Sequence, residues 1–83
     1  MAISLAGVTV TGGEFETASS GINTLDIIIR GTSLTAAQMV ACSNSANGGA
    51  RVTLNDGSKS YTGRCLKVVC ITGYCMAFFT DCI

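Results

Sequence analysis

Cysteine is the residue type in this chain with the widest chemistry, because thiols can attack electrophiles, bind metal ions or form disulfides. The 83 residues include five of them: Cys42, Cys65, Cys70, Cys75 and Cys82. The odd number argues against a complete disulfide framework. In a reducing cytosol, cysteine usually serves as a small core residue. The sequence therefore favours thiols that pack in a hydrophobic core.

Cys70 and Cys75 flank Thr72-Gly73, which predicts a tight turn between two strands. Residues opposed across such a turn lie close enough to form a disulfide. Packed thiols are the favoured interpretation, and a cross-strand disulfide is the alternative. Zinc is disfavoured, because the chain has no histidine and the cysteine gaps do not match the paired short spacings of zinc ribbons. We expect no metal site and no cofactor.

Catalytic groups are scarce. Without histidine the chain lacks the commonest general base and the Ser-His and Cys-His nucleophile pairs. Glu14 and Glu16 fall on one face of a predicted strand, where a solvated surface explains them better than a catalytic carboxylate pair. No glycine-rich phosphate loop is present. We expect a protein that is not an enzyme.

One polar group suggests a ligand site. The predicted hairpin of residues 51–64 places Arg51 and Arg64 on one face, with Lys59 at its tip and Tyr61 beside them. Arginine suits phosphate oxygens, and an aromatic ring can stack on a base. This pattern predicts binding of a small anionic, nucleotide-like ligand. The alternative is that these residues form the solvent face of a strand pair.

The first half of the chain predicts a hairpin over residues 3–17. Gly12-Gly13 would form its turn and pair Val10 with Phe15. A polar connection follows over residues 18–23. Residues 25–30 then predict a strand covered on both sides, since three successive isoleucines place apolar bulk on both faces.

A helix is predicted over residues 34–45. Thr35 and Gln38 have the spacing of a capping box, and Asn47-Gly48-Gly49 suits a helix end. The expected buried stripe consists of Leu34, Ala37, Val40 and Ala41. The opposite, exposed face would carry Thr35, Gln38 and Ser45.

Three strands are predicted after the helix, over residues 51–54, 60–71 and 74–81. Asp56-Gly57 would form a two-residue loop that places Val52 opposite Tyr61, and Gly63 would mark a bulge. The fold class is therefore α+β: a mostly antiparallel sheet or small barrel of about six strands, with one short helix between strands 3 and 4. The whole chain, 1–83, is expected to form one domain.

The C-terminal hairpin is apolar on both faces. One face carries Leu66, Val68, Cys70, Cys75, Ala77 and Phe79, and the other carries Val69, Ile71, Tyr74, Met76 and Phe78. A three-turn helix cannot cover both faces. We expect a homo-oligomer whose interface includes Tyr74, Met76 and Phe78, and the alternative is a closed monomeric barrel.

Composition limits the function classes. Apolar residues make up 48% and charged residues 12%, about half the usual charged fraction of about 25%, so part of the surface is expected to contact another molecule. A net charge of zero argues against general nucleic-acid binding. No signal peptide or membrane span is expected, and a cytoplasmic location is the default.

The function predicted from these features is that of a small non-catalytic binding protein. It would self-assemble and capture a partner protein or small anionic ligand, as an inhibitor or sequestering protein of the kind that phages encode. The alternative is a structural subunit of a virion or another repetitive assembly.

Overall fold

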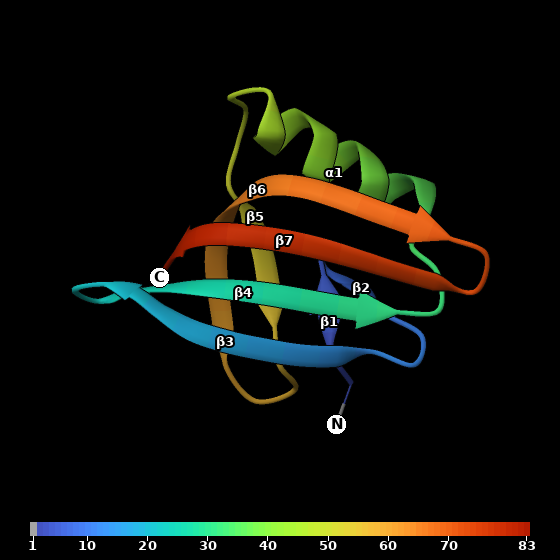
Figure 1. The fold of residues 1–83 in the computed structure, drawn as a ribbon, viewed down its shortest axis with the longest axis horizontal. Coiled ribbons are helices and arrows are strands. Elements are labelled where there is room, and N and C mark those ends of the chain that lie inside the picture. The colour runs from blue at the N-terminus through green and yellow to red at the C-terminus, as the bar shows by residue number, and fades with distance from the viewer. Residues whose placement is uncertain (1) are drawn as a thin grey trace.

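The computed structural model describes residues 2–83, which form a seven-stranded sheet and one helix (Figure 1). The strand order is β2-β1-β5-β6-β7-β4-β3, and every pair is antiparallel. The elements are β1 (Ser4–Leu5), β2 (Val8–Thr9), β3 (Glu14–Gly21), β4 (Thr24–Gly31), α1 (Ala36–Ala46), β5 (Val52–Asn55), β6 (Ser60–Ile71) and β7 (Tyr74–Cys82). The predicted α+β class and mostly antiparallel sheet are confirmed. The sheet is open and has seven strands, and the helix follows the fourth strand instead of the third.

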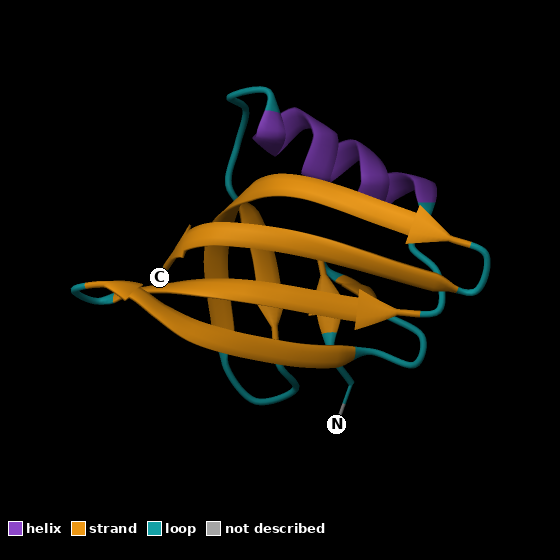
Figure 2. Ribbon diagram, in the orientation of Figure 1, coloured by secondary structure: helices purple, strands orange, loops and turns teal. Residues whose placement is uncertain are grey.

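The sheet folds over on itself along β6. The first part of this long strand pairs with β5, and the rest pairs with β7. Strands β3, β4 and β7 therefore run across β1 and β5 in the other half of the sheet (Figure 2). Gly63 lies at the change of direction, where a Cβ atom would overlap the sulfur of Cys82. The predicted bulge occurs three residues later, since the β6–β7 register shifts between Cys65 and Lys67.

The hydrophobic core lies between the two halves of the sheet and under the helix. Its largest fully buried side chains include Leu5, Ile27, Ile29, Leu54 and Phe79. Alternation along β4 directs Ile27 and Ile29 inward, while Ile28 is half-buried on the other face. The prediction that this strand is covered on both sides is therefore wrong. It lies inside the sheet, between β7 and β3, but its outer face has no covering element in residues 2–83.

The predicted N-terminal hairpin is also wrong. The chain turns earlier, at Ala6-Gly7, where both residues have positive φ as a tight hairpin turn requires. Phe15 pairs with Ile29 of β4 instead of with Val10. The predicted connection over residues 18–23 is largely strand, because β3 continues to Gly21.

Helix α1 begins with the predicted capping box. The Thr35 hydroxyl accepts from the Gln38 backbone N–H at 3.2 Å, and the Gln38 Oε1 accepts from the Thr35 N–H at 2.8 Å. The predicted helix end is confirmed at Asn47. The predicted buried face is wrong, since the helix buries Gln38, Cys42 and Ser45 and leaves Val40 exposed.

Hydrogen bonds explain this inverted helix face. The Gln38 side-chain nitrogen donates to the carbonyl oxygens of Leu5 at 3.2 Å and Val8 at 2.8 Å. The Ser45 hydroxyl accepts from the backbone N–H of Cys65 at 3.0 Å. The polar stripe is therefore buried because it forms hydrogen bonds with backbone groups of the sheet.

The hairpins after the helix differ in how well the sequence predicts them. In the first, Val52 lies opposite Gly63 and Leu54 opposite Tyr61, so the predicted register is wrong by two residues. A two-residue shift preserves the face of every side chain. In the second, the predicted pairs of Ile71 with Tyr74 and Cys70 with Cys75 are confirmed.

Within residues 2–83, no helix is long and apolar enough to cross a lipid bilayer.

Candidate functional site

The outer side of the β6-β7-β4 sheet carries a continuous group of large apolar side chains. We call this group the outer apolar face; it consists of Ile28, Val69, Tyr74, Met76 and Phe78. Cross-strand pairing forms it, since Phe78 lies between Lys67 and Ile28, and Met76 between Val69 and Arg30. Figure 1 looks onto this side, and no ribbon lies in front of β7 and β4.

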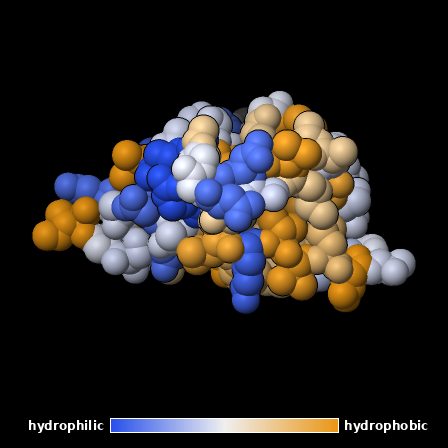
Figure 3. Space-filling view, turned by 90° about the horizontal axis from the view of Figure 1, so that it is seen from above, coloured by the Kyte–Doolittle hydropathy of each residue, from blue (hydrophilic) through white to orange (hydrophobic). Residues whose placement is uncertain are grey.

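Exposure shows that this face is not part of the core. Val69 is 47% exposed and Tyr74 39%, while Ile28, Met76 and Phe78 are half-buried by their neighbours in the sheet. Figure 3 views the molecule from the helix side and sees this face edge-on; hydrophobic side chains gather toward the right of that view, with a further group at the left tip. The outer apolar face itself groups five large apolar side chains on neighbouring strands. Such a grouping on a small protein is typical of an interaction surface.

Charges flank the outer apolar face with opposite signs. On β6 the Lys67 ammonium nitrogen lies 5.0 Å from the centre of the Phe78 ring, in a cation–π contact. On β3, at the other edge, Glu16 pairs with Arg30 at 3.0 Å, and exposed Glu14 lies beside it. The face is therefore positive at its β6 edge and acidic at its β3 edge.

The predicted ligand residues divide into two groups. Arg51 and Arg64 flank the Val52–Gly63 pair of β5 and β6. Arg51 is engaged within the protein: its guanidinium donates to the Thr62 hydroxyl at 3.3 Å, the Thr62 carbonyl at 3.0 Å and the Asp81 carboxylate at 3.1 Å. It also donates to the Asp81 carbonyl oxygen. These contacts fix the end of β7 against β6, whereas Arg64 makes one long contact of 3.5 Å with the Gly49 carbonyl.

Lys59 and Tyr61 belong to a different surface. The Lys59 ammonium nitrogen lies 5.1 Å from the centre of the Tyr61 ring, and that ring stacks on Phe15 with centroids 5.7 Å apart. Because Tyr61 points away from the face of Arg51 and Arg64, the structure does not bring the four predicted ligand residues together.

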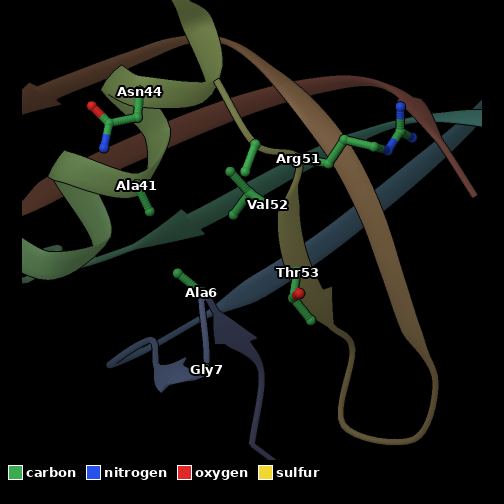
Figure 4. A pocket seen from close by; sticks show the side chains of 8 residues that line it. Ala6, Gly7, Ala41, Asn44, Arg51, Val52 and Thr53 are labelled. Atoms are coloured by element: carbon green, nitrogen blue, oxygen red, sulfur yellow. The ribbon is translucent and has the colours of Figure 1, made fainter. Parts of the chain in front are cut away.

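A cavity of about 500 Å³ opens between α1, the β1-β2 turn and β5 (Figure 4). Small side chains line most of it, including Ala6, Gly7 and Ala41, and Asn44 and Thr53 add polar atoms. Its volume is within the range of small-molecule sites. Arg51 also lines it, and its guanidinium is bound to Thr62 and Asp81.

The cysteines have two distinct roles. Cys70 and Cys75 form a disulfide across the β6-β7 turn, which is the alternative that the sequence placed second. Cys42, Cys65 and Cys82 are buried free thiols, as favoured for the chain as a whole. Burial, aided by the neighbouring Cys65, raises the pKa of Cys42 to about 12, and burial raises that of Cys82 to about 11. These three thiols are protonated at neutral pH, so none is an activated nucleophile.

The raised pKa of Cys82 predicts a loss of stability in alkali. Because the folded state holds this proton more tightly than the unfolded state, the stabilisation is complete below pH 9 and is lost as the pH rises from about 9 to about 11. We expect the free energy of unfolding from urea titrations to fall between about pH 9 and 11. In the Cys82→Ala variant the free energy of unfolding should fall less steeply with pH. An equal slope in the variant and the wild type would contradict the assignment of this loss to Cys82.

The sequence missed three parts of these sites. Ile28 and Lys67 join the outer apolar face through strand pairings that no local pattern shows. Cys42 and Cys65 meet between the helix and the sheet although they are distant in the chain.

Comparison of this chain with protein-family models, curated proteins and solved structures finds no match.

Proposed function

We propose that this protein is a non-catalytic binding protein that self-associates through its outer apolar face. The observation that carries the proposal is the group of large side chains on β6, β7 and β4 that lie exposed or half-buried, above all Val69, Met76 and Phe78. A domain of this size has little stability to spare, and each of these side chains forgoes part of the roughly 1.5–3 kcal/mol that its full burial would contribute. A second copy supplies the missing cover.

Charge selects the arrangement of the two copies. A two-fold axis parallel to β7 and β4 places the β6 edge of one copy over the β3 edge of the other. Lys67 of each copy then faces the acidic edge that carries Glu14 and Glu16, and Phe78 of one copy packs on Ile28 of the other. A perpendicular axis in the same plane would place Lys67 against Lys67. Face-to-face packing of two sheets in this way is a common protein architecture.

This arrangement favours a closed oligomer over a repetitive assembly. A two-fold contact uses the same surface on both copies, so it closes and does not propagate. We therefore favour the sequestering or inhibitory binding protein over the structural subunit. Capture of a partner protein, or of an anionic ligand by Arg64, remains the proposed action of the assembled protein.

Phe78→Lys tests the self-association. It places two charges at the centre of the interface, one from each copy. We expect sedimentation velocity at micromolar concentration to show a dimer for the wild-type protein and a monomer for this variant. Ile22→Lys is the matched control, because Ile22 is 91% exposed at the β3-β4 turn and lies outside the face. This control should remain a dimer, and circular dichroism should show both variants folded. A monomeric wild-type protein at this concentration would contradict the proposal.

The two-fold arrangement has its own readout in the same experiment. Lys67→Glu should weaken the dimer, because it places an acidic residue against the acidic β3 edge. Added salt should weaken the wild-type dimer and strengthen the Lys67→Glu dimer, since screening acts on attraction in one and on repulsion in the other. The same salt response in both proteins would exclude this arrangement.

A further inference from the structure

The space between α1 and β6 gathers sulfur atoms that the proposed self-association does not use. A cavity of about 330 Å³ opens there, and its lining includes Met39 and Cys42 from the helix and Cys65 from the strand. Met39 and Cys42 are three residues apart in α1, so they lie on the same side of the helix. Met39 is 38% exposed, while Cys42 and Cys65 are 1% and 3% exposed. The cavity thus leads from the surface to two buried thiols.

The two thiols are neighbours. Cys42 of α1 and Cys65 of β6 line the same cavity, and both are almost fully buried there. No carboxylate or histidine completes a metal site with the two thiols. Within residues 2–83, no three or more His, Cys, Asp or Glu side chains are placed to hold a metal ion.

Two thiolates and a thioether form a soft ligand set. Zinc prefers four ligands in a closed tetrahedral site, and hard cations prefer oxygen. Thiolate and thioether sulfur select Cu(I) instead. We propose that Cys42 and Cys65, with Met39 at the cavity entrance, form a binding site for one Cu(I) ion.

Binding is a ligand exchange without oxidation or reduction. Two copper–sulfur bonds form at Cys42 and Cys65, and the two thiol protons leave to solvent. The Met39 thioether adds a neutral ligand, so the loaded site carries one negative charge. The ion would join the helix to β6, and binding to the folded state alone would stabilise it.

Competition with a chromogenic Cu(I) chelator under anaerobic conditions, with ascorbate as reductant, tests the site. We expect one equivalent of Cu(I) per chain and a higher melting temperature of the loaded protein. Cys42→Ala and Cys65→Ala should each lower the affinity by more than about 100-fold, since even the loss of a partner outside the ligand shell costs 10–100-fold. Cys82→Ala is the matched control, because it removes another fully buried free thiol and should leave the affinity unchanged.

A second variant keeps the test decisive if Cys42→Ala or Cys65→Ala does not fold. The triple variant Cys70→Ala/Cys75→Ala/Cys82→Ala retains only the proposed pair and should still bind one equivalent. Failure of the wild-type protein to take up Cu(I), or loss of uptake in the folded triple variant, overturns the proposal. A Cys42–Cys65 disulfide in the purified protein, seen as a further loss of two hydrogens by mass spectrometry, also overturns it.

Discussion

Gln38→Ala is expected to lower the free energy of unfolding by about 3 kcal/mol, since it removes three hydrogen bonds that each contribute about 0.5–1.5 kcal/mol. The substitution removes three hydrogen bonds of the Gln38 side chain, to the carbonyl oxygens of Leu5 and Val8 and from the N–H of Thr35. Gln38 is fully buried, so water cannot replace its amide without opening the helix–sheet contact. Urea denaturation followed by circular dichroism measures the loss.

Two further variants separate the contributions of the Gln38 amide. Thr35→Ala removes only the cap and should cost about 1 kcal/mol. Gln38→Glu preserves the shape and the acceptor for Thr35, but it directs a carboxylate at two carbonyl oxygens, so at neutral pH it should destabilise at least as much as Gln38→Ala. A Gln38→Ala protein within about 1 kcal/mol of wild type would show that the amide does not hold the helix on the sheet.

Gly63→Ala is expected to destabilise the protein by about 2–3 kcal/mol, the upper range for overpacking a core. Gly63 is buried where β6 passes from one half of the sheet to the other, and an added Cβ overlaps the Cys82 sulfur. Backbone atoms cannot move away easily, because Thr62 beside it exchanges two hydrogen bonds with Ile83, at 2.8 and 2.9 Å. The shift in the midpoint of urea denaturation measures the effect.

The overlap with Cys82 can be isolated by a double-mutant cycle. The atom nearest the added methyl group is the Cys82 sulfur, so Cys82→Ala should recover most of the stability lost in Gly63→Ala. The remaining neighbours, the Cβ atoms of Cys82 and Phe79, would lie at ordinary contact distances of 3.4 and 3.5 Å. If the two changes simply add, the glycine is required for another reason.

Local signals predict the parts of this fold that depend on neighbouring residues. The capping box of Thr35 and Gln38 and the turn at Thr72-Gly73 are set within a few residues, and the structure confirms both. The N-terminal turn is different. Gly12-Gly13 is the stronger glycine signal, but β3 pairs with β4 instead, and Ala6 accepts a φ of 55° at the actual turn. Pairing of β3 with the next strand, β4, overrides the glycine preference there.

The helix face could not be predicted from hydrophobicity. Apolar periodicity assumes that polar side chains face water, whereas Gln38 and Ser45 are buried because they bond to backbone groups of distant strands. The candidate site likewise has a part that local sequence patterns predict and a part that depends on contacts between distant residues. Alternation along β7 places Tyr74, Met76 and Phe78 on one face from sequence alone. The contributions of Ile28 and Lys67 and the meeting of Cys42 with Cys65 depend on the tertiary fold.

The position of β7 in the sheet has a consequence for how the chain folds. This strand is inserted between β6 and β4, yet it follows both in the sequence. During synthesis the β3-β4 hairpin and the β1-β5 pairing can form early, but nothing joins them until β7 leaves the ribosome. Sheets closed by such distant pairings have high contact order and fold in milliseconds to seconds. The two halves of the core should therefore become protected from hydrogen exchange together, in one late step.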